Sequence, residues 1–302
     1  MRIGRVLAAL LASGISLSSA EEAPYVREKP KGHLKCPELR EASGLATSPT
    51  SNDFLWLIND SGCPAEIHLA ENDGGDRGKI SLSHAKNHDW EDLDSFILDG
   101  KPYLLIADTG DNASKRSECM LYIVPEPTLP EKGEDLSGQA KPAWKIRFHY
   151  EDGPRDCEAV GVDAQAGKIL LLSKRTSPPM LYELPLKPAS DELQTAKKIG
   201  EIPKTLPAGF PPIPFGTQPT GMDIAADGSA AAVVTYYGLF LFPRASGETW
   251  AKAFSRPPEL LGAHRMGQVE SVAFSRDSKV IRLVAEGGKS PVARYVKAEK
   301  GN

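Results

Sequence analysis

One short pattern occurs five times along this chain, and it constrains the fold more than any other feature. A polar residue, glutamate in four copies, opens a strand-like run, and a second apolar run follows some 10 to 15 residues later. The openings are EASGLA from Glu41, EDLDSF from Glu91, EAVGVD from Glu158, TGMDIA from Thr220 and ESVAFS from Glu270. Their intervals of 50, 67, 62 and 50 residues match the length of a four-stranded propeller blade with its loops.

Apolar runs of 4 to 8 residues alternate with Gly, Pro, Asp and Asn clusters throughout the chain, which is typical of strands. Most copies have four such runs, and the fourth run of the fourth copy is AKAFS (251–255). The last copy ends one strand short, at ARYVK (293–297). We therefore predict an all-β fold: one five-bladed β-propeller over residues 33–297, in which HLKCPEL (33–39) completes the last blade. A six-bladed ring is the alternative.

The first 20 residues have the three parts of a secretory signal: Arg2 and Arg5, an apolar stretch from Val6 to Leu17, and a small-residue cleavage site at Ala20. We expect a cleaved signal peptide over residues 1–20, and hence a periplasmic or secreted protein.

Residues 21–32 would then form an N-terminal extension and residues 298–302 a C-terminal tail. No later apolar run is long enough for a membrane span. A formal charge of −4 without a basic cluster argues against nucleic acid as a partner. We expect a monomer.

Four cysteines in an exported chain suggest two disulfides. In a propeller, the loop between the second and third strands and the link between blades return to the same face. Cys63 and Cys119 fall in or near loops of the first kind, whereas Cys36 and Cys157 fall near links of the second kind. We predict the pairs Cys36–Cys63 and Cys119–Cys157.

Residues at equivalent positions of the innermost strands would form a ring around a central channel. Four carboxylates that converge there must either take up protons or bind a cation, because like charges in a buried site repel. Oxygen donors alone suit Ca²⁺ better than Zn²⁺. We predict a Ca²⁺ site formed by Glu41, Glu91, Glu158, Thr220 and Glu270. The alternative is structural: each glutamate caps a strand or pairs with an arginine.

The second strands should end at the same face, in polar residues. Lys174 and Arg175 follow the apolar run ILLL with no turn residue between, and a cation beside a bound metal would hold a phosphate, carboxylate or sulfate group. The candidate catalytic residues are Asp108, as a general base, with Lys174 and Arg175. The candidate substrate-binding residues are Asp60, Asp89, Asp111, Tyr236 and Glu286.

These repeats, with their DWED, GDN and SKR elements, resemble a family of secreted bacterial β-propeller proteins of largely unassigned function. The chain is more remotely similar to the calcium-activated nucleotidases (apyrases), five-bladed propellers that hold one Ca²⁺ with Ser, Glu, Glu, Ser and Glu from their inner strands. The resemblance implies a similar metal ring and a basic site at SKR. The chain departs from that family in having Glu41 in place of serine, and in lacking an arginine near Asn59-Asp60-Ser61-Gly62.

Lactonase-type six-bladed propellers also resemble the chain, although Thr220 stands where they carry a metal-binding asparagine.

Two classes of function follow. The first is a Ca²⁺-dependent hydrolase of a small anionic substrate with a phosphoanhydride, phosphoester or lactone bond. The second is a non-catalytic propeller with a structural Ca²⁺ that binds a ligand or an unknown protein on one face.

Overall fold

The computed structural model describes residues 24–203 and 216–299, so the predicted signal peptide lies outside the described residues. Within these ranges the chain forms strands β1 to β21 and one five-residue helix, α1 (Trp250–Phe254). The all-β prediction is therefore confirmed. No helix among the described residues has the length and apolar character needed to cross a membrane.

Most strands belong to five successive antiparallel groups of four. The first two groups are β2 (Ala42–Thr47), β3 (Phe54–Asn59), β4 (Glu66–Glu71) and β5 (Asp76–Leu82), then β6 (Trp90–Leu98), β7 (Lys101–Asp108), β8 (Cys119–Pro125) and β10 (Trp144–Tyr150). The third and fourth groups are β11 (Cys157–Asp163), β12 (Lys168–Ser173), β13 (Met180–Pro185) and β14 (Gln194–Glu201), then β15 (Pro219–Ile224), β16 (Ala230–Thr235), β17 (Gly238–Pro243) and β18 (Glu259–Ala263). The fifth is β19 (Val269–Phe274), β20 (Val280–Ala285), β21 (Ala293–Lys297) and β1 (Tyr25–Glu28).

Two parallel pairings connect these groups at their outer edges. Strand β10 pairs with β14, which joins the second and third groups into one eight-stranded sheet. The short strand β9 (Gln139–Ala140) pairs with β5 and adds a fifth strand to the first sheet.

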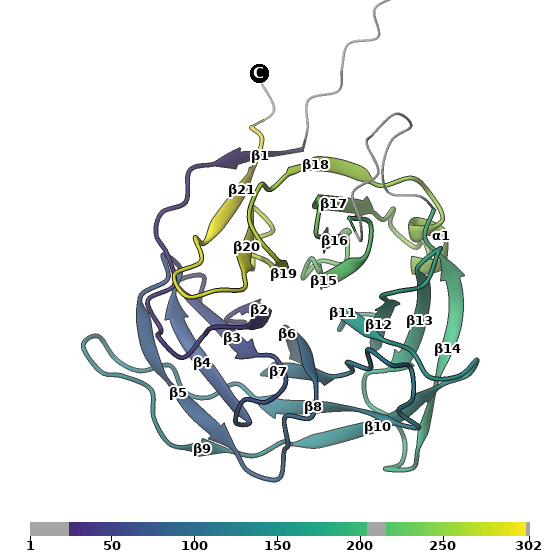
Figure 1. Ribbon diagram of the computed structural model, residues 1–302, viewed down its shortest axis with the longest axis horizontal. Helices are drawn as coiled ribbons and strands as arrows, with labels where there is room; N and C mark the ends of the chain where they lie inside the picture. Colours follow the sequence, from purple (N-terminus) through teal and green to yellow (C-terminus); the bar gives the residue numbers. More distant parts are fainter. Residues whose placement is uncertain (1–23, 204–215, 300–302) are drawn as a thin grey trace, which may run out of the picture.

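The first strands of the five groups surround a common axis (Figure 1). Strands β2, β6, β11, β15 and β19 contact one another in that order, and β19 contacts β2 again. Five buried apolar clusters lie between neighbouring groups. Each group is thus covered on both faces, which explains why strands such as β2 and β19 are buried along their whole length.

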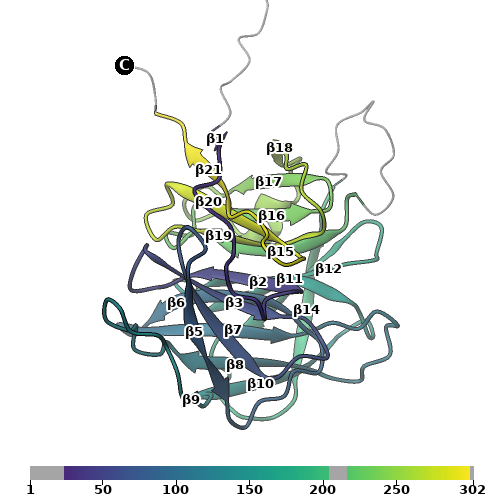
Figure 2. The same ribbon diagram turned by 60° about the vertical axis from the view of Figure 1, so that its left-hand side comes forward.

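A strand from the N-terminus completes the fifth group, but it is not the predicted segment 33–39. Strand β1 pairs with β21 (Figure 1 and Figure 2), and its Tyr25 is buried and donates a hydrogen bond to the Ser278 carbonyl at 2.6 Å. Segment 33–39 instead packs Leu34 and Leu39 into the apolar cluster between the first and fifth groups. Its apolar residues resemble a strand because they fill this core.

The predicted outer strand AKAFS (251–255) was also wrong, since most of it lies in α1. The side chain of Thr249 caps the helix by accepting the Lys252 N–H. Trp250, Ala253 and Phe254 have helical spacing and face the apolar cluster between the third and fourth groups. The outer strand of this group is β18, a few residues later.

Candidate metal centre

Each inner strand carries a β-bulge near its first residue, where its pairing with the second strand skips one residue. The skipped residues are Ser43, Glu91, Glu158, Thr220 and Glu270. Four of the five ring residues are therefore at equivalent positions. The first position belongs to Ser43 and not to Glu41, which lies two residues earlier and is exposed. In the first repeat the glutamate of EASGLA suggests the ring position, whereas the β-bulge lies at the serine.

Glu41 belongs to a second set of equivalent residues, two positions before each bulge. This set is Glu41, Asp89, Asp156, Gln218 and Gln268. Asp156 is not among the predicted site residues, although DWE and DCE share the spacing Asp-x-Glu, a signal that an alignment of the repeats contains. The buried amide oxygen of Gln218 has no hydrogen-bond partner among the described residues.

Glu91 is the residue around which the carboxylates gather. A carboxylate oxygen of Glu91 lies within 4.8 Å of carboxylate oxygens of Asp60 and Asp89. In a second group, a carboxylate oxygen of Glu91 lies within 4.8 Å of carboxylate oxygens of Asp156 and Glu158. Glu91 is only 4% exposed. Burial, and then the charges of Glu158 and Asp60, raise the pKa of Glu91 well above its ordinary value. Burial likewise raises the pKa of both Asp60 and Asp89.

Gly110 leaves the space in which these carboxylates lie. A Cβ atom at this position would fall 2.2 Å from Glu91 Oε1 and 2.5 Å from Asp89 Oδ2. The backbone N–H of Gly110 donates to the Asp89 carbonyl at 3.1 Å, which holds Gly110 close to Asp89. The absence of a side chain at position 110 therefore lets the carboxylates of Glu91 and Asp89 lie close to this backbone.

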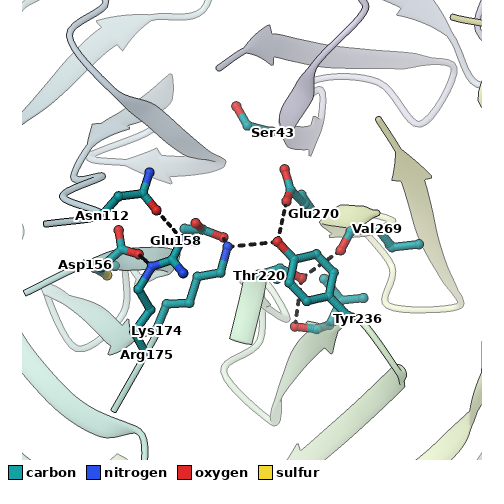
Figure 3. Close-up of polar contacts among 12 residues, drawn as sticks. Ser43, Asn112, Asp156, Glu158, Lys174, Arg175, Thr220, Tyr236, Val269 and Glu270 are labelled. Atoms are coloured by element: carbon teal, nitrogen blue, oxygen red, sulfur yellow. Dashed lines mark hydrogen bonds and ion pairs between the residues drawn. The ribbon is translucent and has the colours of Figure 1, made fainter. Parts of the chain in front are cut away.

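Lys174 lies between Glu158 and Tyr236 (Figure 3). Its buried ammonium group is paired with Glu158 and donates to the Tyr236 hydroxyl at 2.9 Å. That hydroxyl donates to Glu270 Oε1 at 2.9 Å. Burial raises the pKa of Glu158 to about 8, against the opposing effect of Lys174. Lys174 thus places a positive charge beside Glu158, whereas Asp60, Asp89 and Glu91 have no Lys or Arg partner among the described residues.

Arg175 is paired with Asp156 at 2.6 Å and also contacts Asn112 (Figure 3). Its side chain is 40% exposed, whereas that of Lys174 is 4% exposed. Of the two predicted cations, Arg175 is therefore the one that can meet a ligand from solution. The buried carboxyl of Asp156 also accepts the backbone N–H of Asp111 at 2.9 Å.

The predicted base Asp108 is engaged within the protein. It forms an ion pair with Arg116 at 2.8 Å and accepts the N–H groups of His88 and Asp89, both at 3.3 Å. Asp111 in turn accepts the Arg116 N–H at 2.7 Å. Asp108 therefore holds the segment that carries Asp89, and Asp111 holds the backbone of Arg116, the partner of Asp108.

The remaining predicted residues lie at the same end of the inner strands. Glu270 and Glu286 are hydrogen-bonded to each other, and burial followed by that bond raises the pKa of Glu286 to about 8. The two hydroxyls of the ring donate to carbonyls of the next inner strand: Ser43 to Trp90 at 2.9 Å and Thr220 to Val269 at 2.7 Å.

All four cysteines are thiols in the structure, so neither predicted disulfide is formed. Cys36 is buried, and its sulfur lies 3.5 Å from Nδ1 of His68, whereas Cys63 is half-buried in the turn after β3. Cys119 and Cys157 are both buried in the apolar cluster between the second and third groups, and burial raises the pKa of each thiol to about 12. Packing thus accommodates Cys36, Cys119 and Cys157 as small apolar side chains.

No protein family model matches the chain, and no curated protein matches its sequence.

Proposed function

We propose that this protein is an exported five-bladed β-propeller that binds a divalent cation, Ca²⁺ by its donor set, at the bulge end of its central channel. The five four-stranded groups support five blades rather than six. One observation carries the cation: the carboxylates of Asp60, Asp89 and Glu91 converge within 4.8 Å, and none of them pairs with Lys or Arg among the described residues.

The residues present fit a hard cation. The three carboxylates offer only oxygen. Negative charge is concentrated around them, since burial and then the charges of Asp89, Glu270 and Glu41 raise the pKa of Asp60. Asp60, Asp89 and Glu91 would hold the cation, and Ca²⁺ accepts such a set more readily than Zn²⁺ does. A divalent cation at this place would polarise the oxygen atoms of a bound group and lower the pKa of a bound water.

Calorimetric titration of the protein with Ca²⁺ tests the cation site. Glu91→Gln should weaken binding by about tenfold or more, or about 1.4 kcal/mol, because it removes the charge shared by both acidic groups. Glu66→Gln is the matched control. Glu66 also lies in a cluster of possible metal ligands, with Glu38 and His68, but both glutamates of that cluster form ion pairs with Lys79. The proposal fails if the protein binds no Ca²⁺, or if both variants weaken binding equally.

A metal-dependent hydrolase of phosphoanhydride or phosphoester bonds is the activity that this site supports best. The half-exposed guanidinium group of Arg175 lies beside the acidic groups, since its partner Asp156 is within 4.8 Å of Glu91. Arg175 would bind the anionic part of a substrate. The order Ser43, Glu91, Glu158, Thr220 and Glu270 is also similar to the ring order of the calcium-activated nucleotidases.

A hydrolysis screen over nucleotides, phosphoesters and lactones, with Ca²⁺ or with chelator, tests this activity. Arg175→Ala should reduce turnover about 100-fold, a typical loss for one charged group that binds the transition state, and leave Ca²⁺ affinity unchanged. If no substrate is hydrolysed in the presence of Ca²⁺, the non-catalytic propeller with a ligand-binding face is the better description.

A further inference from the structure

Two acidic groups share Glu91 in the candidate metal centre. In each group the carboxylate oxygens lie within 4.8 Å of one another. The first group is Asp60, Asp89 and Glu91, and the second is Glu91, Asp156 and Glu158. Together they offer oxygen ligands for two neighbouring divalent cations, which lie about 3.5–4 Å apart in two-metal sites. The proposed Ca²⁺ fills the first group only.

The second group differs from the first in its positively charged partners. The ammonium group of Lys174 pairs with Glu158, and the guanidinium group of Arg175 pairs with Asp156 at 2.6 Å (Figure 3). The first group has no Lys or Arg partner among the described residues. Lys174 is only 3% exposed, and lysine is almost never buried to this extent unless it is paired. The carboxylates of the second group therefore hold Lys174 inside the molecule.

Contacts at both ends of the residue fix the position of Lys174. Its backbone N–H donates to the Asp156 carbonyl at 2.9 Å. Its ammonium group donates to the Tyr236 hydroxyl at 2.9 Å, and that hydroxyl donates to Glu270 Oε1 at the same distance. The side chain of Arg175, by contrast, is 40% exposed. Lys174 is therefore the fixed positive charge of the second group.

The formal charges of the two groups favour one divalent cation over two. Their five carboxylates can carry five negative charges, and Lys174 and Arg175 carry two positive ones. One divalent cation brings the total close to zero, whereas a second one would reverse its sign. The second cation would also lie beside the ammonium group, and like charges in a buried site repel strongly. Lys174 thus competes with a second metal ion for the same carboxylates.

We propose that the ammonium group of Lys174 takes the place of a second divalent cation and limits the centre to one Ca²⁺, an inference that rests on the proposed cation site. In this role Lys174 is a positioning residue, which acts on the number of bound ions through Glu158. Removal of its charge opens the second acidic group to a divalent cation, because the oxygen ligands of that group remain in place.

Calorimetric titration with Ca²⁺ up to about 10 mM, beyond the range of weak extracellular sites, tests this role. The unmodified protein should bind one Ca²⁺ and Lys174→Met two, the second with a dissociation constant of about 1 mM or lower. Addition of Glu158→Gln to Lys174→Met should return the number to one, because a ligand of the second group is lost. Lys168→Met is the control: Lys168 lies on β12 and pairs with Glu183, outside the acidic groups, so this variant should bind one Ca²⁺.

Melting temperatures keep the test decisive if Lys174→Met is unfolded in chelator. Ca²⁺ should then fold the variant, because the bound ion replaces the lost charge, and a variant that stays unfolded in about 10 mM Ca²⁺ would overturn the proposal. A single Ca²⁺ in both Lys174→Met and the unmodified protein would overturn this role and leave the proposed function standing. Two in the unmodified protein would do the same. If only Lys174→Met binds Ca²⁺, the proposed function fails and the role of Lys174 stands, and if neither protein binds it, both fail.

Discussion

Burial and crowding act together on the carboxylates around Glu91. Each of these acids is removed from water, and each lies near others of the same charge, so both effects favour the protonated form. The sequence predicts the positions of Glu91, Glu158 and Glu270, because glutamate recurs at one place in the repeat. It does not predict their partners: Lys174 pairs with Glu158 within the third group, whereas the hydrogen bonds of Tyr236 to Lys174 and Glu270 join different groups.

The stability of the metal-free protein should therefore fall as pH rises. The pKa values of Glu158 and Glu286 are raised from 4.5 to about 8, so the folded protein holds protons that the unfolded chain has lost between these values. Stability decreases with pH wherever the folded state binds more protons. Urea unfolding in chelator should show a lower free energy of unfolding at pH 8 than at pH 5.5.

Saturating Ca²⁺ should remove much of this pH dependence, because cation binding displaces the protons. Glu91→Gln, which takes away one charge from the crowded groups, should flatten the profile in chelator. An unfolding free energy that rises from pH 5.5 to pH 8 in chelator would contradict this view of the site.

At the scale of elements, the five β-bulges determine which residues form the ring. Strand periodicity predicts where an inner strand begins to within about two residues, and a bulge shifts the alignment by one. This explains why Glu41 was assigned in place of Ser43. The spacing Asp-x-Glu is visible in the sequence at DWE and DCE. Only the strand register shows that Glu41-Ala42-Ser43 occupies the same three positions in the first group.

Gly110 offers a test of the site that leaves every carboxylate in place. Gly110→Ala adds a methyl group where Glu91 Oε1 and Asp89 Oδ2 lie, so it should displace them and weaken Ca²⁺ binding about tenfold or more. Gly200→Ala in β14 is the control, because a Cβ there meets nothing within 4 Å. Equal Ca²⁺ affinity of Gly110→Ala and the unmodified protein, measured by calorimetry, would contradict a cation site at the carboxylates of Glu91 and Asp89.

In the molecule as a whole, the pairing of β1 with β21 joins the first and the last strand of the described residues. The sequence predicted that an N-terminal strand completes the last group, because the fifth repeat is one strand short. It could not identify β1, since YVRE has only one buried residue in four. The edge of β21 selects this strand through its hydrogen bonds, which a hydrophobic pattern does not record.

Tyr25 should carry much of the stability that this closure provides. Tyr25→Ala removes a buried ring that packs near Phe274 and should lower the free energy of unfolding by about 3 kcal/mol. Val26→Ala, at a residue 55% exposed on the same strand, should change it by less than about 0.5 kcal/mol. Similar losses for both variants in urea unfolding would argue against a closing role for β1.

The position of a bound cation is the most direct test of the proposed metal centre. Crystals grown with Ca²⁺ and then soaked in Mn²⁺ would locate the ion by its anomalous scattering. We predict one peak in contact with the carboxylate oxygens of Asp60, Asp89 and Glu91. No peak at the bulge end of the inner strands, or a peak held by Asp156 and Glu158 with Lys174 displaced, would contradict it.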